Sequence, residues 1–391
     1  MHARVQTGLS KSQHRTGTFV RRPYLRVANV QDGYLDLTEM KEIDVPIAQV
    51  DRFTLRSGDV LLTEGGDFDK LGRGALWTDE IEGCVHQNHV FAVRVNDPAA
   101  VLPEFLACDV QSARAKKYFL ACAKQTTNLA SINSSQLKNL PIVIPPPTEQ
   151  AAIVEALRTW DTAIQKSEQL TLAKTRKKLA AMRALLTGER RLKGFESCWA
   201  ERQLGELFQE RTETGRADLP LLSLASGQGI VPQNTLERRD ISNEDKAKYL
   251  RICPGDIGYN TMRMWQGVSA LSRYEGIVSP AYTVCIPSGD IDGKFASYLF
   301  KLPTMINRFY RYSQGLTSDT WNLKFRYFAK IKLRIPEVGE QVAIASALML
   351  LDQELELLRQ LTSRLVQQKR GLMQKLLTGE WRLPLPEREA V

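Results

Sequence analysis

The feature of this sequence that most constrains its fold is an internal repeat with a constant offset of 191 residues (331 − 140). Residues 140–192 align with residues 331–383 without a gap. The identical positions include an Ile-Pro pair, a Glu-Gln pair and the run Leu-Leu-Thr-Gly-Glu at 185–189 and 376–380. A repeat of this kind predicts a chain built as two copies of one structural plan.

Each repeated segment begins with an alternating apolar pattern, at 140–144 and 331–335, that predicts a short strand. A proline ends each strand, and a stretch rich in good helix formers follows it. Gly188 and Gly379 stand where a C′ glycine ends a helix. Because apolar residues repeat in heptads along these stretches, we expect two helices, each about 57 Å long, that pack together as a coiled coil. The alternative is that each helix packs on its own globular domain.

Two regions of similar size, residues 1–139 and 194–330, surround the first helix and hardly resemble each other. They share only a sparse skeleton of matching residues, in which Gly58-Asp59-Val60 matches Gly255-Asp256-Ile257 at an offset of 197 (255 − 58). They diverge directly after it. Similar helices that join dissimilar globular regions suggest a rigid spacer with two separately tuned recognition heads.

Composition narrows the class of protein. The chain has 391 residues, of which 43% are hydrophobic and 25% charged, as in ordinary globular proteins. No long apolar run predicts a membrane span, and the first residues lack a secretory signal pattern. The 6 cysteines form no C-x-x-C pair, which indicates reduced thiols and a cytoplasmic location. The net charge of +9 favours a polyanionic partner.

The familiar signatures of catalysis are absent from the sequence. It contains no phosphate-binding G-x-x-x-x-G-K-[ST] loop, no H-E-x-x-H and no G-x-S-x-G. Cys84, His86 and His89 have a spacing that could hold zinc, but no fourth ligand lies nearby in the sequence. We therefore expect no metal and interpret the polar run 86–89 as hydrogen-bonding groups for base edges or phosphates.

Polar, basic, glycine and aromatic residues cluster in loops of both heads, in the same order along the chain. Each cluster alone is typical of a solvated loop, but together on a basic chain they favour nucleic acid. The residues predicted to contact DNA are Gly65, Gly66, Lys70, Arg73, His86, Gln87, Asn88, His89, Lys124 and Thr126 in the first region, and Asn260, Thr261, Arg263, Trp265, Gln266, Ser279, Tyr282, Gln314, Thr317 and Ser318 in the second.

With these motifs, the chain resembles the specificity subunits of type I restriction–modification systems over essentially its full length. The resemblance lies in the runs at 29–33, 58–61, 64–74, 86–91, 255–257, 260–267 and 279–282, and in the repeated helical units. It implies an α+β fold of two mixed α/β target-recognition domains, separated by two long helices packed as an antiparallel coiled coil with a pseudo-two-fold repeat. The implied domains are residues 1–143 and 194–334, and the conserved helical regions are residues 144–193 and 335–391.

The same resemblance implies a non-catalytic subunit that recognises a bipartite, asymmetric double-stranded DNA target. It implies two methyltransferase subunits and restriction or translocase subunits as partners, and no membrane. S-adenosylmethionine, ATP and magnesium are expected only on those partners, and no cofactor on this chain. The rival readings are a stand-alone DNA methyltransferase or nuclease, and a coiled-coil adaptor without DNA contact.

The sequence departs from the family pattern in one place. The second head opens with Trp199 and the run 204–207, which is the usual start of a recognition domain in this family. The first head has no counterpart. We therefore expect the leading edge of the first domain to pack differently, as it would in an N-terminally truncated domain.

Overall fold

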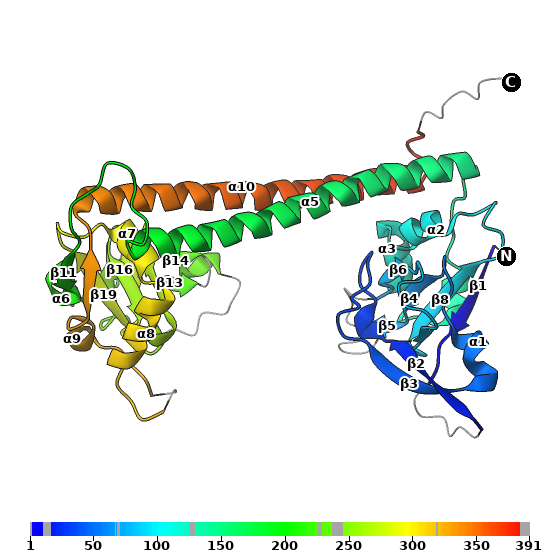
Figure 1. Ribbon diagram of the computed structural model, residues 1–391, viewed down its shortest axis with the longest axis horizontal. Helices are drawn as coiled ribbons and strands as arrows, with labels where there is room; N and C mark the ends of the chain where they lie inside the picture. The colour runs from blue at the N-terminus through cyan, green and yellow to red at the C-terminus, as the bar shows by residue number, and fades with distance from the viewer. Residues whose placement is uncertain are drawn as a thin grey trace. The chain divides into compact units, whose positions relative to one another are not determined.

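The computed structural model describes residues 2–10, 17–66, 68, 71–125, 130–225, 228–236, 245–317 and 320–383. The chain divides into two compact units, namely unit 1 (residues 1–168 and 360–391) and unit 2 (residues 169–359). Each unit contains a globular head and parts of the two long helices labelled α5 and α10 (Figure 1). In the described part of the chain, no helix combines the length and apolar character needed to cross a bilayer.

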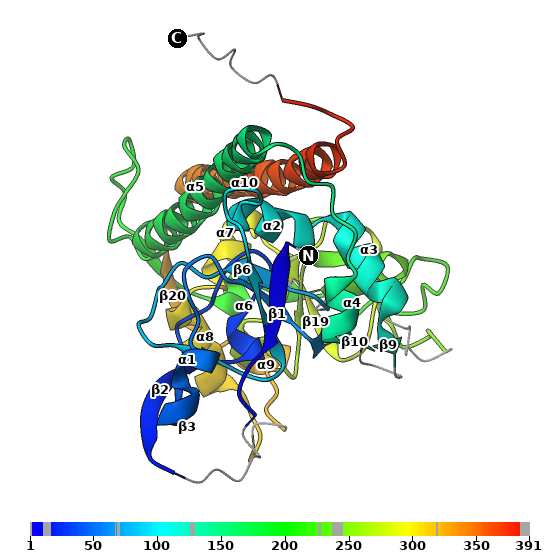
Figure 2. The ribbon, with the colours of Figure 1, turned by 90° about the vertical axis from the view of Figure 1, so that its right-hand side faces the viewer.

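The head of unit 1 consists of small sheets with short helices packed on them (Figure 2). The central sheet has the strand order β1-β8-β4-β6, with bounds Ala3–Thr7, Val90–Val95, Val60–Thr63 and Gly74–Leu76. The other sheets are β3-β2-β7 (Lys41–Pro46, Phe19–Leu25, Val85–His86) and β5-β10-β9 (Gly65–Gly66, Ala130–Ser131, Lys124–Gln125). The helices are α1 (Val50–Phe53), α2 (Pro103–Val110), α3 (Ala113–Cys122) and α4 (Ser134–Lys138). One face of the central sheet shares a hydrophobic core with α2, α3 and α4.

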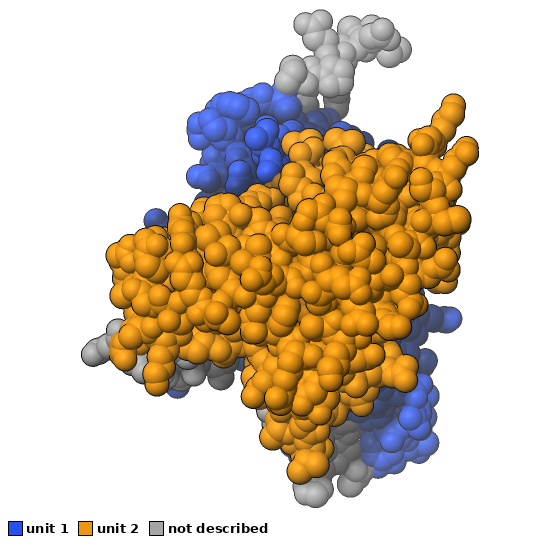
Figure 3. All heavy atoms as spheres, turned by 90° about the vertical axis from the view of Figure 1, so that its left-hand side faces the viewer, with its two compact units in different colours: residues 1–168, 360–391 blue, residues 169–359 orange. Residues whose placement is uncertain are grey.

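The head of unit 2, which belongs to the orange surface in Figure 3, is built in a similar way. Its central sheet has the order β12-β19-β16-β17, with bounds Phe208–Glu210, Tyr282–Pro287, Ile257–Asn260 and Ser269–Leu271. Three strand pairs accompany it, namely β11-β20 (Ala200–Gln203, Lys332–Ile335), β13-β14 (Leu222–Ala225, Gly229–Pro232) and β15-β18 (Leu250–Ile252, Gly276–Val278). The helices are α6 (Leu204–Leu207), α7 (Gly293–Leu299), α8 (Pro303–Tyr312) and α9 (Phe325–Phe328).

The two central sheets share one topology. In each sheet, the strand after the Gly-Asp pair (β4 or β16) lies between two antiparallel neighbours. The edge strand beyond one of these neighbours, β1 or β12, is the strand of that sheet that comes first in the sequence. The glycine takes a left-handed backbone in both heads, with φ of 87° at Gly58 and 94° at Gly255. This turn explains why the Gly-Asp skeleton recurs in two otherwise dissimilar regions.

The aspartate of this skeleton forms a buried ion pair in both heads, but its arginine comes from different strands. Asp59 accepts hydrogen bonds of 2.6 and 2.5 Å from Arg94, which lies on β8 next to β4. Asp256 instead accepts bonds of 2.8 and 3.1 Å from Arg211, which directly follows the edge strand β12. The shared sheet therefore conserves the ion pair but not the position of its cation.

The long helices α5 (Pro147–Leu186) and α10 (Val338–Leu377) each contribute one half to each unit. Within unit 1, Lys369 bonds to Asp161 at 2.5 Å. Within unit 2, the residues at the same positions of the other repeat, Lys178 and Asp352, also lie 2.5 Å apart. In each unit, a lysine of one long helix thus pairs with an aspartate of the other, and the two helix segments run in opposite directions.

A second reciprocal ion pair joins the beginning of each long helix to the tail that follows the other. Glu149 pairs with Arg382 in unit 1, and Glu340 pairs with Arg191 at 2.6 Å in unit 2. The carboxylates are buried, with side chains only 3% and 0% exposed. Trp199 also donates to Glu340 at 3.2 Å. The glutamate of each repeated Glu-Gln motif is therefore joined to the arginine two residues after the other Leu-Leu-Thr-Gly-Glu run.

The neighbouring glutamine connects each long helix to its own head. Gln150 accepts a hydrogen bond of 2.8 Å from the backbone N–H of Leu102, which precedes α2. Gln341 accepts one of 2.8 Å from the N–H of Asp292, which precedes α7. Both glutamines are fully buried. Each helix is thus fixed to its head by a hydrogen-bonded side chain with no exposure to solvent.

The strand expected at residues 140–144 does not form, whereas its repeat forms β20. The reason is the availability of a partner. β20 pairs with β11, whereas no described residue of the first head forms a strand pair with residues 140–144. Since a strand needs a neighbour for its backbone hydrogen bonds, the alternating pattern alone was insufficient.

Candidate nucleic-acid interface

The polar residues predicted in the second head meet where β16 ends. The N–H of Thr261 donates to the carbonyl of Ala281 at 3.0 Å, and the carbonyl of Thr261 accepts from the N–H of Leu323 at 2.9 Å. The hydroxyls of Thr261 and Thr283 lie 3.1 Å apart. Segments 260–266, 279–283 and 314–323 therefore converge on one residue. We call these three segments, as far as they are described, the recognition edge of unit 2.

The first segment of this edge is a compact turn that presents a free cation. The side chain of Asn260 accepts from the N–H of Met262 at 3.0 Å, and its carbonyl accepts from the N–H of Arg263 at 3.0 Å. The indole of Trp265 donates to the carbonyl of Met262 at 3.0 Å. Arg263 and Gln266 are exposed. Among the residues that the structure describes, the guanidinium of Arg263 has no ion-pair partner, so it is available to a ligand.

The last segment of the edge is a closed loop. Gln314 and Asn322 exchange two backbone hydrogen bonds of 2.8 Å each. At the base of the loop, Trp321 makes edge contacts with Trp265 at 5.0 Å and with Tyr310 at 4.9 Å between ring centroids. This aromatic group connects the loop to the turn that carries Arg263. Tyr310 and Trp321 were missed by the sequence reading because they lie outside the motifs, and only their spatial neighbours reveal their place.

The remaining predicted residues of this edge have modest roles in the structure. The hydroxyl of Ser279 accepts from the N–H of Ala281 at 3.3 Å, which shapes the turn before β19. Tyr282 is half-buried at the start of β19. Thr317 is exposed and bonds within the loop to Thr320. All three lie in the recognition edge of unit 2.

The first head assembles an equivalent edge around Glu64. The N–H of Glu64 donates to the carbonyl of His89 at 2.9 Å, and its carbonyl accepts from the N–H of Ile132 at 2.8 Å. These are the two backbone bonds that Thr261 makes in the second head. We call residues 63–66, 88–90 and 124–132, as far as they are described, the recognition edge of unit 1. Its exposed polar groups differ from those of unit 2, since His89 contacts Glu64 at 2.5 Å and Lys124 is exposed.

The glycines of this edge serve the packing of the chain itself. Gly65 and Gly66 form β5 and pair with β10. A Cβ atom at Gly65 would lie 2.9 Å from the carbonyl oxygen of Ala130, so a side chain does not fit there. Arg73 is half-buried and donates to the side chain of Gln31 at 3.0 Å. Neither observation requires a ligand.

Part of the polar run 86–89 is buried, and one residue must be removed from the predicted contact set. His86 is 1% exposed, and its Nδ1 lies 3.1 Å from the carbonyl of Phe53. Burial lowers its pKa from 6.5 to about 4, so the ring is neutral at physiological pH. The side chain of Gln87 accepts from the N–H of Val27 at 3.2 Å, and Asn88 lies 3.3 Å from the ring of His89. Only His89 of this run is exposed.

Lys70, Thr126 and Ser318 lie outside the described residues. Among the described residues, no group of three or more His, Cys, Asp or Glu side chains could hold a metal ion. Cys84 is buried, and burial raises the pKa of its thiol to about 12. A thiol in this environment stays protonated and is a poor zinc ligand.

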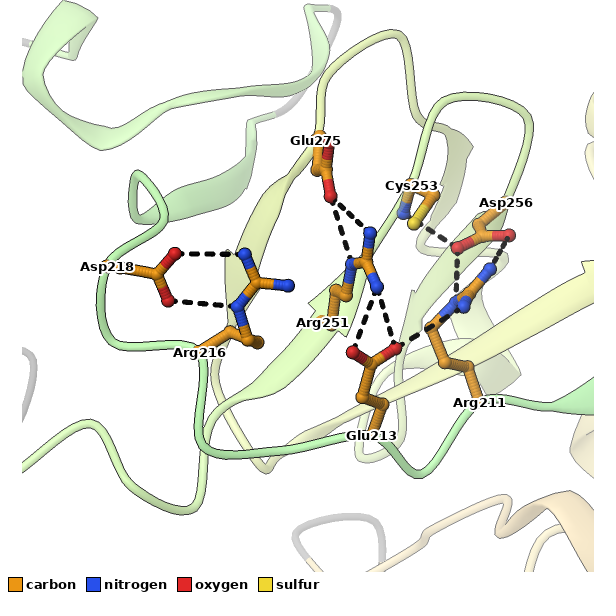
Figure 4. A network of polar contacts seen from close by, with 8 residues as sticks. All are labelled: Arg211, Glu213, Arg216, Asp218, Arg251, Cys253, Asp256 and Glu275. Atoms are coloured by element: carbon orange, nitrogen blue, oxygen red, sulfur yellow. Dashed lines mark hydrogen bonds and ion pairs between the residues drawn. The ribbon is translucent and has the colours of Figure 1, made fainter.

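Several arginines of the second head are already neutralised by carboxylates (Figure 4). Arg251 bonds to Glu213 at 2.9 Å and to Glu275 at 2.5 Å, and both contacts raise its pKa. Arg216 bonds to Asp218 at 2.9 Å. This network surrounds the Asp256 end of β16, whereas the recognition edge lies at the opposite end of that strand. These paired arginines differ from Arg263, whose guanidinium has no ion-pair partner among the described residues.

Comparison with known proteins agrees with this organisation. Residues 6–174 match the family model described as type I restriction modification DNA specificity domain. A protein named as the MjaX specificity subunit of a type I restriction enzyme, from Methanocaldococcus jannaschii, is 22% identical over 97% of this chain and 91% of its own length. The EcoKI specificity subunit of Escherichia coli strain K12 is 27% identical over 44% of this chain and 37% of its own length.

Solved structures share the fold over nearly the whole chain. The HsdS subunit from Thermoanaerobacter tengcongensis superposes with a TM-score of 0.52 at 15% identity and covers 97% of both chains. A chain from a study of complex assembly and conformational transition in a type I restriction–modification system superposes with a TM-score of 0.61 at 16% identity, over 97% of this chain and 98% of that one. The mixed α and β fold of this chain is therefore one that such subunits adopt.

Proposed function

Because the chain belongs to the family of type I restriction–modification specificity subunits, which are non-catalytic, we propose that it recognises a bipartite, asymmetric DNA sequence. Each head recognises one half-site through its recognition edge. The helices α5 and α10 pair as an antiparallel coiled coil that sets the spacing and docks two methyltransferase subunits together with restriction subunits. S-adenosylmethionine, ATP and magnesium belong to those partners, in the cytoplasm.

The observation that carries this proposal is the equivalence of the two recognition edges. Glu64 and Thr261 make the same two backbone hydrogen bonds in their respective heads. The side chains around them differ in charge, size and hydrogen-bonding capacity. A common backbone frame with different side chains is what two half-sites of different sequence require, because base edges are distinguished by side-chain donors and acceptors.

The reciprocal ion pairs support the role of the helices. Lys369 with Asp161 and Lys178 with Asp352 repeat one contact under the internal symmetry of the chain. For a bipartite target read by two heads of one chain, we expect half-sites whose centres lie about one helical turn, roughly 10 base pairs, apart. Since the heads differ in sequence, the target is neither continuous nor palindromic.

The experiment that tests this proposal exchanges one head. Residues 194–330 are replaced by the corresponding region of another specificity subunit, and the modified bases are mapped in cells that hold the methyltransferase subunits. We expect one half-site to change while the other half-site and the spacer stay the same. A change in both half-sites would contradict independent heads, and retention of the parental target would contradict recognition by this region.

Individual roles are tested by binding measurements on every single-base variant of the target at two salt concentrations. Arg263→Ala is expected to cost about 1–3 kcal/mol and to relax the choice at one base of the second half-site. Lys70→Ala is expected to weaken all sequences alike and to lower the salt slope by about one, as for a phosphate contact. The opposite pattern would reverse the two assignments.

The rival function, a stand-alone methyltransferase or nuclease, gives a different result in a simple assay. Isothermal titration of the purified chain with S-adenosylmethionine is expected to show no binding. Micromolar binding without partner subunits would favour the enzyme. An adaptor without DNA contact is tested by duplex binding of the assembled complex, which must weaken steeply with rising salt if phosphates are neutralised.

A further inference from the structure

Leu316 lies near the tip of the closed loop in the recognition edge of unit 2, and its side chain is 100% exposed. An apolar side chain with no protein contact gains nothing from the folded state, because the hydrophobic effect rewards only buried surface. The loop is not a random exposed segment, since the backbone bonds between Gln314 and Asn322 close it. We therefore ask which ligand the exposed side chain of Leu316 could contact.

Hydrogen bonds constrain the described residues on either side of Leu316. The N–H of Thr317 donates to the hydroxyl of Thr320 at 3.1 Å, and the carbonyl of Thr317 accepts from Thr320 and Trp321 at 3.0 and 3.1 Å. A Cβ atom at Gly315 would lie 2.6 Å from the carbonyl oxygen of Thr320, and Gly315 has a φ of 137°. The chain thus needs glycine before Leu316 in order to turn so tightly, and the turn directs the leucine to solvent.

The surroundings of this loop are aromatic and polar. Trp321 at its base contacts Trp265 and Tyr310, and Trp265 belongs to the turn that presents Arg263. An apolar tip close to hydrogen-bonding groups and a cation matches the chemistry of proteins that bend DNA. Such proteins insert Leu, Ile, Met or Phe between base steps while Arg, Asn and Gln contact the base edges and backbone.

We infer that Leu316 is an apolar wedge that enters the base stack of the second half-site. This inference rests on the proposed function, because it assigns a role within the same recognition edge. Insertion buries the leucine between two base pairs and unstacks that step. The unstacked step then contributes to sequence choice, because pyrimidine–purine steps open more easily than others. No covalent step is involved.

The test uses the complex assembled with its methyltransferase subunits and duplexes that carry 2-aminopurine at successive positions of the second half-site. Fluorescence of this base rises when it loses its stacking neighbours. With the parent protein we expect a rise at one step on binding. Leu316→Ala should abolish that rise and weaken binding roughly ten- to fifty-fold, from the lost burial of the apolar side chain. Leu316→Met, which keeps a long apolar side chain, should retain both effects.

A matched control is Tyr274→Ala. Tyr274 is also an exposed apolar side chain of unit 2, with 45% exposure, but it follows the far end of β17 and lies outside the recognition edge. It should leave both fluorescence and affinity unchanged. Complex assembly, followed by size-exclusion chromatography, should be the same for all variants, and a loss of assembly in Leu316→Ala would overturn the inference in favour of a protein contact.

The outcomes separate this inference from the proposed function. If the parent complex shows no salt-dependent preference for the target duplex, the proposed function fails. If it binds the target but no position gains fluorescence, the wedge is wrong while sequence recognition stands. If Leu316→Ala alters only the preference for thymine over uracil, without any unstacking, the leucine contacts a thymine methyl group and the wedge is again refuted.

Discussion

Replacing Arg94 by isoleucine should destabilise unit 1 strongly. Asp59 is 0% exposed, and Arg94, 19% exposed, bonds to both of its carboxylate oxygens. After the replacement, the N–H of Arg56, at 2.8 Å, is the one hydrogen-bond donor among the described residues that still bonds to the Asp59 side chain. A buried charge that loses its partner costs about 3–5 kcal/mol. For a unit of this size that loss lowers the melting temperature by roughly 6–20 °C.

The second head suggests how to rescue this variant. There the cation, Arg211, lies opposite Val284, while the buried Asp256 directly precedes the next strand, β16. The strand registers place Gln6 in the same position of the first head, because Gln6 is paired with Ala92 in β8. The double variant Arg94→Ile with Gln6→Arg should therefore recover most of the lost stability.

Differential scanning calorimetry of the single and double variants measures both effects. The control is Arg21→Ile, because the ion pair between Arg21 and Glu42 is largely exposed, with side chains 72% and 53% accessible. Such a pair contributes no more than about 1 kcal/mol. A single variant that melts like this control would refute the argument from burial, and a double variant no better than the single one would refute the equivalence of the two sheets.

Three further predictions concern groups that the structure buries. Because the pKa of His86 falls from 6.5 to about 4 in the folded state, its contribution is complete above pH 6.5 and is lost as the pH drops toward 4. The loss amounts to about 3 kcal/mol of unfolding free energy, which urea titrations of the parent at several pH values should show. The His89→Gln variant should show the same loss, and the His86→Gln variant should not. Mass spectrometry after brief thiol labelling should find the exposed Cys198 modified, whereas Cys285, buried with its pKa raised by that burial, should react only after unfolding. Gln341→Ala should lower the urea midpoint by an amount equal to about 1–3 kcal/mol, because it leaves buried backbone groups next to α7 unpaired; an unchanged midpoint would argue against this joint.

Sequence reasoning succeeded where a local pattern determines local structure. The long Pro-poor stretches predicted helices, and the structure contains α5 and α10 there. The repeated Gly-Asp pair predicted a shared skeleton, and both heads contain the same turn and buried ion pair. It failed at residues 140–144, where the alternating pattern was present but no partner strand lies among the described residues.

The candidate site shows the same division. The motifs predicted contact residues in the segments after β4 and β16, and backbone hydrogen bonds bring the described parts of these segments together in each head. They could not tell that His86 is buried while His89 is exposed, although both stand in one polar run. Burial depends on segments distant in the sequence, and Phe53 in particular supplies the carbonyl that His86 contacts.

By itself, the sequence determined the duplicated plan, the two long helices and the positive charge that suits a polyanion, because each of these follows from residue identity and spacing. Only the tertiary structure decided which cations are free. Arg211 and Arg263 are equally basic, yet Arg211 is neutralised by Asp256 and Arg263 faces solvent. An ion pair forms between residues that the fold brings within a few ångströms, and their separation along the chain carries no record of that distance.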